Sequence, residues 1–411
     1  MSDCPTHGLM DVDVAIAQLQ QAGRAKTPEI EEVTLAEALG RILAENIVST
    51  VDVPPQANSA MDGYALNAAD LHAEMTFIVS QRIAAGSSPV KLQQGTIARI
   101  FTGAVIPDGA NAVVMQENCQ VQSDGRVTLL QTVVEQENIR PRGQDIEKNQ
   151  QILQQGERLT AAKIGLLATI GKATVRVYCR LKVVFFSTGD ELVDAGQPLA
   201  VGQIYNSNRY LLQALLNSMG FIAIDGGVIA DNLPDTLHAF EKAAQTADVI
   251  ISTGGVSVGE EDHVKAALSR CGELALWKVA IKPGKPLAFG RVNNVPFMGL
   301  PGNPQSVWVT FLMLARQFLL NYQGQRLALL PHELPVVADF TVAKAQQRRE
   351  YVRVRLEPSE NGLVMVKHPN QSSGVLSSAV WADGFALLEK GQTVNKGEQL
   401  PFISFASLSI A

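Results

Sequence analysis

The stretch LKVVFFSTGDEL, residues 181–192, decides the fold of this chain. It is a continuous run of aliphatic and aromatic residues that ends abruptly in a polar Ser-Thr-Gly-Asp-Glu segment. Strands buried on both faces have this composition, and they occur mainly in parallel sheets covered by helices. The stretch therefore predicts a buried strand with a polar loop at its carboxyl end.

Similar apolar runs recur downstream and alternate with segments of helical period. The runs are FIAIDGGVI (221–229), DVIISTGG (248–255) and VPFMGL (295–300). The segments between them are NRYLLQALLNSMG (208–220), LPDTLHAFEKAAQTA (233–247) and DHVKAALSRCG (262–272). This alternation indicates a parallel sheet covered by helices, so residues 181–325 are predicted to form a central α/β domain.

The flanking segments have different patterns. Residues 50–147 contain short β-like runs between Gly, Pro and Asp turns, which predicts an inserted β-rich domain. Residues 326–411 return to short strands such as REYVRVRLEP, which predicts a C-terminal β-barrel domain, with a sandwich as the alternative. The helical segments DVDVAIAQLQQAGRA, TLAEALGRILAENIV and ERLTAAKIGLLATIGKA lead us to expect one discontinuous helical and extended domain from residues 1–49 and 148–180.

Composition excludes several classes of function. The 411 residues carry a formal net charge of −6, whereas a non-specific nucleic-acid binder or an anionic-membrane binder needs a basic face. The four cysteines lie far apart without a C-x-x-C pair, so neither a zinc cage nor a disulfide framework is predicted. The acidic first residues do not resemble a secretory signal, and the most apolar helix is interrupted at Arg316 and Gln317, so we expect a cytoplasmic protein.

The loops after the predicted strands carry most of the polar chemistry. Ligands of a parallel sheet bind beyond the carboxyl ends of its strands, where such loops gather. In STGDEL, Asp190 and Glu191 are candidate Mg²⁺ ligands, and the alternative is a helix cap with an acidic first turn. Asp231 and Asp262 have the same alternative, since each precedes a predicted helix.

One of these loops is rich in glycine, and another has a glycine just before a predicted helix. STGGVSVGEED contains Gly254, Gly255 and Ser257, and its backbone amides are predicted to approach an anion at a helix N-terminus. The loop matches neither G-x-G-x-x-G nor a phosphate-binding loop ending in Gly-Lys-Ser/Thr, which argues against an NTPase. LPGNPQS places Gly302 and Asn303 at the start of the apolar helix, where a simple turn and cap is the alternative interpretation.

Positive charge is concentrated in WKVAIKPGKPLAFG, residues 277–290. Lys278 is predicted to lie in a strand, and Lys282 and Lys285 flank a Pro-Gly turn. Ammonium groups are costly to bury without partners, so they are expected to face acids or an anionic ligand, unless they only extend from a surface turn. Arg140 adds a guanidinium group suited to phosphate, and the alternative there is a surface arginine.

Taken in order, NSAMDGYA, FTGA, RGQDI, FSTGDEL, GQIYNSNR, GGVSVGEED, KPGKP and LPGNPQS closely resemble the MoeA family of molybdopterin molybdotransferases, which includes the E domain of gephyrin. The resemblance covers nearly the whole chain. It implies a homodimer of elongated subunits with one domain like a molybdopterin adenylyltransferase. It also implies the reaction of adenylylated molybdopterin with molybdate to give molybdenum cofactor and AMP, with a divalent cation such as Mg²⁺.

The resemblance also implies roles for particular residues. The family's functional positions fall on Asp62, Thr102, Asp145, Glu191, Asp231, Asp262, Lys278, Lys282, Pro301 and Pro304. In the family these line a cleft between the α/β domain of one subunit and the MDGYA domain of the other. There, Asp231 is expected to hold Mg²⁺ together with Asp190 and Glu191. Asn206 and Gln144 depart from the family pattern, which often has acidic residues at these positions.

Two other functions remain open at the level of sequence. A pterin carrier or scaffold would bind the ligand without turnover, and a molybdopterin adenylyltransferase would share the α/β domain. The set of acids and lysines argues against a scaffold, and the single α/β domain joined to two β-rich regions fits the inserting enzyme better. The resemblance further suggests the adenylyltransferase and the molybdoenzyme acceptors as protein partners.

Overall fold

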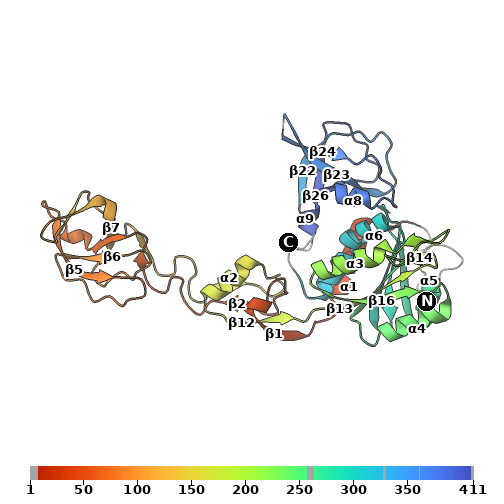
Figure 1. Ribbon diagram of the computed structural model, residues 1–411, viewed down its shortest axis with the longest axis horizontal. Coiled ribbons are helices and arrows are strands. Elements are labelled where there is room, and N and C mark those ends of the chain that lie inside the picture. The colour runs from red at the N-terminus through yellow and green to blue at the C-terminus, as the bar shows by residue number, and fades with distance from the viewer. Residues whose placement is uncertain (1–7, 257–262, 327–329, 361, 409–411) are drawn as a thin grey trace.

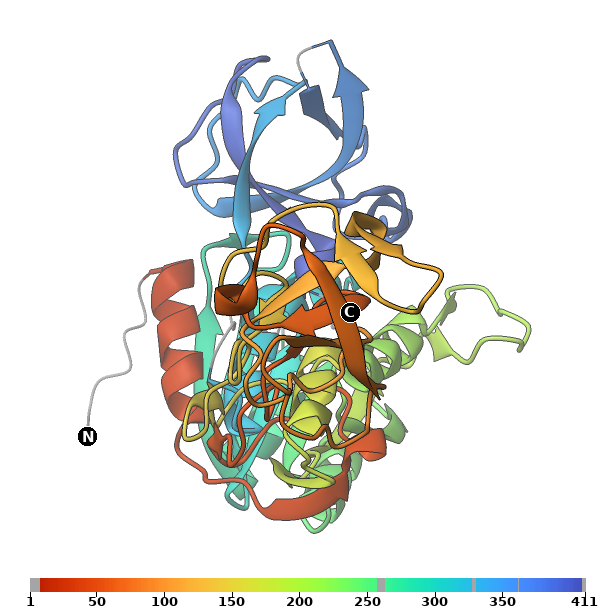
Figure 2. The ribbon, with the colours of Figure 1, turned by 90° about the vertical axis from the view of Figure 1, so that its left-hand side faces the viewer.

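A computed structural model describes residues 8–256, 263–326, 330–360 and 362–408. The molecule is elongated, with the β-rich insert at one end and the α/β and C-terminal domains at the other (Figure 1). Seen from the β-rich end, the C-terminal domain stands above the α/β domain (Figure 2). The predicted multidomain architecture of α/β and β parts is confirmed.

The α/β domain is built on a six-stranded sheet in the order β16-β13-β17-β21-β20-β18. Its strands are β13 (Lys182–Thr188), β16 (Ile222–Ile229), β17 (Val249–Thr253), β18 (Gly272–Lys278), β20 (Pro286–Val292) and β21 (Val295–Leu300). The first four strands in the sheet order are parallel to one another. Their carboxyl ends therefore meet at one edge, as the alternating pattern predicts.

The other two strands correct the expectation of a wholly parallel sheet, because β20 is antiparallel to both β18 and β21. Only Asn293 and Asn294 connect β20 to β21, and both have positive φ angles, of 46° and 71°. A two-residue connection of this kind forms a tight hairpin, whereas a parallel pair needs a crossover of a dozen or more residues.

Helices cover both faces of this sheet. They are α1 (Val12–Gly23), α3 (Ser207–Ser218), α4 (Leu233–Ala243), α5 (His263–Cys271), α6 (Pro304–Thr310), a π-helical turn η4 (Phe311–Ala315) and α7 (Arg316–Tyr322). Val183 and Phe185 of β13 pack in the core with α1, α3, α6 and α7, and Val184 and Phe186 pack in the core with α4 and α5. Burial on both faces explains why four consecutive residues of β13, Val183 to Phe186, are apolar.

We expect Phe240→Ala to destabilise the α/β domain by about 3–5 kcal/mol, the usual cost of deleting a buried phenyl ring. Phe240 is fully buried, and its ring centroid lies 5.0 Å from that of Phe297 and 6.0 Å from that of Phe186. Urea unfolding followed by tryptophan fluorescence measures the change. An unchanged midpoint would show that the layer between α4 and the sheet contributes little to stability.

A small unit links the α/β domain to the β-rich insert. It contains β1 (Ile30–Thr34), a 3-10 turn η1 (Leu35–Glu37), β2 (Ile47–Val48), β11 (Gln151–Leu153), α2 (Ala161–Thr169) and β12 (Thr174–Tyr178). Its core draws on residues 33–47 and 146–177, whereas α1 packs in the α/β core. The structure therefore groups α1 with the α/β domain, although the sequence places it with residues 148–180.

The predicted helix TLAEALGRILAENIV is wrong, because only Leu35–Glu37 forms a helical turn. Gly40 has a φ of +74°, which interrupts a right-handed helix. Ile42 and Leu43 are instead fully buried and form isolated bridges to Arg158 and Val177. Tertiary pairing of the backbone thus overrides the helical period of the side chains.

The β-rich insert contains a six-stranded sheet in the order β7-β4-β6-β5-β9-β8. The elements are β3 (Asn58–Ser59), β4 (Gly63–Leu66), η2 (Ala68–Asp70), β5 (Thr76–Ile83), β6 (Thr96–Ile100), β7 (Ala112–Met115), η3 (Gln116–Asn118), β8 (Cys119–Val121), β9 (Val127–Leu129) and β10 (Ile139–Arg140). This confirms the predicted β-rich character of residues 50–147.

The C-terminal domain is a closed barrel rather than a sandwich. Its elements are β22 (Glu333–Ala338), β23 (Arg349–Ser359), β24 (Gly362–Lys367), α8 (Ser377–Trp381), β25 (Gly384–Leu388), β26 (Gln399–Ser404) and α9 (Phe405–Leu408). The strands follow the order β23-β24-β22-β26-β25, and β25 also pairs with β23, which closes the ring. A short sixth strand, β19 (Ile281–Lys282), pairs parallel to β23. The lysine turn of the α/β domain is thereby attached to the barrel.

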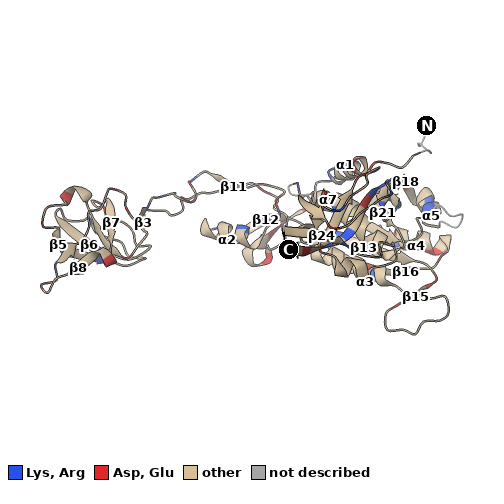
Figure 3. Cartoon of the chain, turned by 90° about the horizontal axis from the view of Figure 1, so that it is seen from above, with Lys and Arg blue, Asp and Glu red and all other residues tan. Residues whose placement is uncertain are grey.

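The distribution of charged side chains and the hydropathy of the helices agree with what the composition predicts. Lysine and arginine side chains are interspersed with acidic ones along the molecule (Figure 3). Within the described ranges, no helix combines the length and the apolarity needed to cross a bilayer. Cys119, Cys179 and Cys271 are free thiols.

Candidate active site

Two adjoining cavities lie at the carboxyl edge of the parallel strands. The larger, of about 670 Å³, is bordered by the ends of β13 and β17 and by the start of α3. The smaller, of about 550 Å³, lies between the lysine turn and the C-terminal barrel. Both are lined by the same four residues, Gly254, Gly255, Gly302 and Asn303. The cavities are thus two compartments of one cleft, as strand-end loops of an α/β sheet are expected to form.

The shared glycines allow close approach of the backbone. Gly254 has a φ of +83°, and a Cβ atom there would lie 2.7 Å from Thr188 Oγ1. Gly255 has a φ of +63°, and its Cβ would lie 2.5 Å from Val264 Cγ2. Side chains at these positions would be strained and would clash, so glycine is required for this turn. Gly254 and Gly255 thus line both cavities, and their contact with a ligand stays a prediction.

The larger cavity is the acidic compartment. Glu191 and Asp231 line it, and no lysine or arginine is among its described lining residues. Asp190 is not among the residues that line this cavity. Its Oδ1 instead accepts a hydrogen bond from the backbone N–H of Asp231 at 3.2 Å. Asp190 therefore ties the loop after β13 to the loop after β16.

The capping alternatives for these acids are wrong. Asp190 and Glu191 precede the short strand β14 (Leu192–Val193), which pairs with β15 (Ile204–Tyr205), so they start no helix. Helix α4 is capped by Asn232, whose side chain accepts a hydrogen bond from the N–H of Asp235. The carboxylate of Asp231 is consequently available to the cavity.

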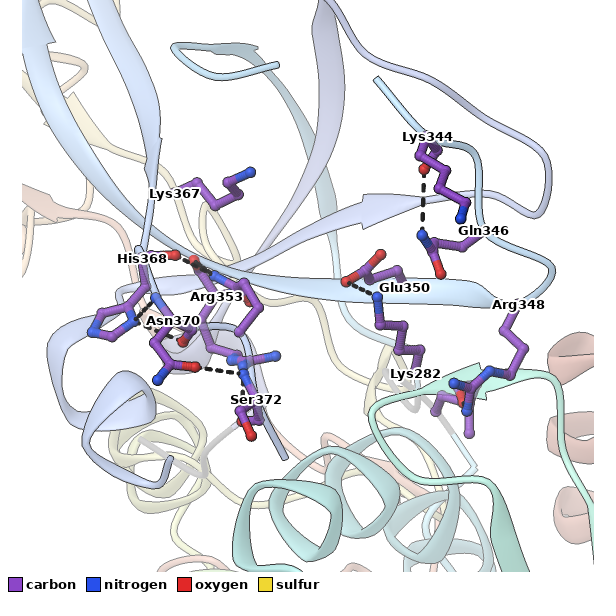
Figure 4. A network of polar contacts seen from close by, with 12 residues as sticks. Lys282, Lys344, Gln346, Arg348, Glu350, Arg353, Lys367, His368, Asn370 and Ser372 are labelled. Atoms are coloured by element: carbon purple, nitrogen blue, oxygen red, sulfur yellow. Dashed lines mark hydrogen bonds and ion pairs between the residues drawn. The ribbon is translucent and has the colours of Figure 1, made fainter. Parts of the chain in front are cut away.

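The smaller cavity is the basic compartment. Lys282, Lys285 and Arg348 line it, and the lining residues that the structure describes include no acid. Lys282 Nζ forms an ion pair with Glu350 Oε1 at 3.0 Å, and the Arg348 guanidinium donates to the carbonyl of Ile281 at 3.1 Å (Figure 4). The side chain of Glu350 is only 9% exposed, so Lys282 pairs with a largely buried carboxylate and does not simply extend into solvent.

The remaining loop residues take up different positions. Pro304 lines the acidic compartment and Pro301 the basic one. Asn303 precedes α6, but its side chain makes no capping hydrogen bond, so the cap alternative does not account for it. Lys278 is exposed at the end of β18 and lines neither compartment. Ser257 and Asp262 lie outside the described residues.

Four predicted residues belong to the β-rich insert. The backbone N–H and the hydroxyl of Thr102 both donate to Asp62 Oδ1, at 2.7 and 2.8 Å. These hydrogen bonds hold the pKa of Asp62 below its usual range. Arg140 and Asp145 are exposed. This domain stands at the far end of the molecule from the cleft (Figure 1), so a single chain does not bring these residues to the lysines.

Sequence reasoning missed the contribution of the barrel to the cleft. Arg348, Gln371, Ser372 and Ser373 line the basic compartment, and Glu350 supports it. The cluster of basic residues at 348–349 is visible in the sequence, but nothing local connects it to a turn more than 60 residues earlier. The pairing of β19 with β23 makes this connection.

The fold and the cleft define a class: a multidomain α/β protein with an acidic and a basic compartment side by side at the carboxyl edge of its sheet. Three family models match the chain in order. They are the MoeA N-terminal region (domains I and II) over residues 10–171, a probable molybdopterin binding domain over 184–321, and the MoeA C-terminal region (domain IV) over 335–405. This chain belongs to the MoeA family.

Relatives and solved structures agree. The chain is 40% identical to a molybdopterin molybdenumtransferase of Haemophilus influenzae, over 92% of this chain and 95% of the relative. It is 38% identical to the protein of that name from Nostoc, over 89% and 86% respectively. A crystal structure of the molybdopterin biosynthesis MoeA protein from Pyrococcus horikoshii matches with a TM-score of 0.78 at 31% identity, covering 97% of this chain and 99% of the other.

Proposed function

We propose that this protein is a transferase that inserts molybdenum in molybdenum cofactor biosynthesis. Adenylylated molybdopterin and molybdate are the substrates, and molybdenum cofactor and AMP are the products. The division of the cleft into an acidic and a basic compartment carries this proposal, because the reaction must bring two anionic substrates together. Family membership and the names of the relatives support it.

The basic compartment suits molybdate. Molybdate is a tetrahedral dianion, and Lys282, Lys285 and Arg348 provide three cationic donors around one cavity. Serine hydroxyls at 372 and 373 and the backbone of the glycine loop add neutral donors beside them. Fixed donors of this kind lower the repulsion between two approaching anions without reorganising at the moment of reaction. Tungstate has nearly the same size and charge and is expected to bind as well.

The acidic compartment suits Mg²⁺. Among the described residues no cluster of three acids, histidines or cysteines could enclose a metal. Two carboxylates on one cavity wall, Glu191 and Asp231, nevertheless fit Mg²⁺, which keeps several waters and binds substrate phosphates as well. When bound, this ion would withdraw charge from the pyrophosphate bridge and make AMP a better leaving group. Asp190 would hold the loops of the two carboxylates at a fixed spacing.

A homodimer would complete the site. The insert that carries Asp62, Thr102, Arg140 and Asp145 extends away from the cleft of its own chain. An antiparallel arrangement of two elongated subunits would bring this insert to the cleft of the partner, as the family resemblance implies. We propose that the dimer works in the cytoplasm, with the molybdopterin adenylyltransferase and molybdoenzymes as the source and acceptors of the pterin.

The experiment that tests this function is AMP release from purified protein with adenylylated molybdopterin and Mg²⁺, in the presence and absence of molybdate. Release that depends on molybdate supports the transferase. Tight pterin binding without AMP release would favour the carrier or scaffold. In that case Lys282 would contribute to binding and not to turnover. ATP consumption with molybdopterin would favour the adenylyltransferase.

We expect Asp62→Asn to reduce molybdate-dependent turnover about 10–100-fold while the insert stays folded. Because its pKa is held low by Thr102, Asp62 is a carboxylate at neutral pH and acts as an acceptor or a negative charge rather than as an acid. Initial rates of AMP release and the dimer mass by light scattering measure the two effects. Asp124→Asn, an exposed acid in the same domain, is the matched control. Loss of the dimer in Asp62→Asn alone would assign Asp62 a structural role instead.

A further inference from the structure

The two acids of the acidic compartment are attached to two separate sheets. The short strands β14 and β15 form a sheet of their own, which is not joined to the six-stranded sheet by backbone pairing. Glu191 directly precedes β14, whereas Asp231 closely follows β16, the edge strand of the six-stranded sheet. The spacing of the two carboxylates therefore depends on the contacts that fasten one sheet to the other.

Arg209, in the first turn of α3, contacts both sheets. Its Nη1 donates to Asp194 Oδ1, directly after β14, and its Nε donates to Asp225 Oδ2 in β16, each at 2.5 Å. The other oxygen of Asp225 accepts from the backbone N–H of Gly227 at 2.8 Å, which fixes that carboxylate on its strand. The side chains of Arg209 and Asp225 are only 26% and 24% exposed, so salt screens this ion pair less than a fully exposed one.

The start of α3 is itself fixed to the six-stranded sheet. Asn206 caps the helix, and its Oδ1 accepts from the backbone N–H of Arg209 and from the hydroxyl of Ser187, near the end of β13, both at 3.1 Å. The amide of Asn206 provides this cap without adding a charge to the compartment that it lines. Arg209 therefore extends toward Asp194 and Asp225 from a fixed base.

The backbone alone holds the loop of Glu191 weakly. Strands β14 and β15 pair over two residues each, and so short a pair is not stable by itself. The hydrogen bond from the Asp231 N–H to Asp190 joins the two loops near the acids. Arg209 adds a charged link farther from the acids, between the end of β14 and β16.

We propose that Arg209 is a positioning residue of the metal site, which sets the spacing of Glu191 and Asp231 by fastening β14 to β16. This inference rests on the proposed function, which assigns Mg²⁺ to these two carboxylates. Arg209 is not among the described residues that line either compartment, so it acts on the ion only through Asp194 and Asp225. Because Mg²⁺ demands near-ideal octahedral geometry, its affinity depends on how its ligands are spaced.

The test is binding of Mn²⁺ to the full-length protein in the presence of AMP, followed by the paramagnetic resonance signal of the free ion. Mn²⁺ shares the octahedral oxygen coordination of Mg²⁺, and a mixture of Mn²⁺ and AMP without protein gives the baseline. We expect Arg209→Met to weaken Mn²⁺ binding at least tenfold, as the loss of a supporting contact of a metal ligand typically does. Charge alone predicts the opposite sign, because removing a cation beside an acidic cavity favours a divalent ion.

Turnover provides a second readout. In AMP release, Arg209→Met should need at least tenfold more Mg²⁺ for half of its maximal rate, while the rate at saturating Mg²⁺ stays within twofold of wild type. Lys26→Met is the matched control, because it removes another partly exposed ion pair of the same domain, to Asp248 at 3.0 Å. Asp248 precedes β17 at the opposite edge of the sheet, so this variant should bind Mn²⁺ as wild type does.

Arg209→Lys covers the case in which Arg209→Met fails to fold. Lysine keeps the charge but lacks the planar fork that reaches two carboxylates, so Mn²⁺ binding is expected to weaken about threefold for a geometric reason alone. If wild type binds Mn²⁺ and neither variant binds it more weakly, the positioning role is refuted and the proposed function stands. If wild type binds no Mn²⁺ with AMP, the metal site and the positioning role are refuted together, and molybdate-dependent AMP release decides separately whether the transferase stands.

Discussion

Replacing Lys282 with alanine is expected to lower molybdate-dependent AMP release about 100–1000-fold, the usual effect of removing one fixed donor from a preorganised anion site. Lys282 lines the basic compartment, and its ammonium group is oriented by the 9%-exposed side chain of Glu350. The loss should be largest at low molybdate concentration, because the affinity for the dianion falls together with the rate. Initial rates of AMP release over a molybdate titration measure both effects.

The stability of this variant needs a separate control, since Lys282→Ala leaves the buried Glu350 carboxylate without its partner. Lys282→Gln removes the charge but keeps a hydrogen-bond donor to Glu350, and we expect a similar loss of rate with a smaller change in melting temperature. Lys344→Ala, at an exposed position of the barrel that lines neither compartment, should behave as wild type. Normal molybdate dependence in Lys282→Gln would transfer the oxyanion role to Lys285 and Arg348.

The second large effect is expected for Glu191→Gln, which should reduce Mg²⁺-dependent turnover about 100-fold or more, since a bound metal supplies several kcal/mol of charge stabilisation. The amide keeps the shape of the side chain but is a far poorer ligand for a hard cation. Glu191 is exposed on the wall of the acidic compartment, so the substitution should leave folding almost unchanged. A Mg²⁺ titration of AMP release measures the effect.

Two variants separate the roles of the neighbouring acids. Asp231→Asn should produce a loss comparable to that of Glu191→Gln, because both side chains line the same cavity. Glu241→Gln, an exposed acid on α4 outside the cavity, is the control. An unchanged Mg²⁺ requirement in Glu191→Gln would leave Asp231 as the candidate ligand on this cavity wall, and an unchanged requirement in both Glu191→Gln and Asp231→Asn would place the metal elsewhere.

The sequence predicted helices and strands correctly where the period of the apolar residues matches the geometry of the element that buries them. The apolar run at 181–188 is buried on both faces as β13, and the helical period at 207–218 becomes α3, because side chains repeat with the geometry of the element that buries them. The helical period failed as a signal at 34–48. The apolar residues there follow a helical spacing, but they are buried where the backbone forms strand bridges, and a glycine with positive φ interrupts any helix. Periodicity indicates which residues are buried, but not always whether they lie in a helix or in a strand.

The sequence by itself determined the domain order, the parallel core of the sheet, and the chemistry of the loops that line the cleft, from Glu191 and Asp231 to Lys282 and Lys285. These features depend on residues close together in the chain. Only the tertiary structure decided that β19 joins the barrel and that Glu350 orients Lys282. These contacts join segments 68 residues apart, and their geometry arises when the barrel closes on the α/β domain, which no local pattern of side chains encodes.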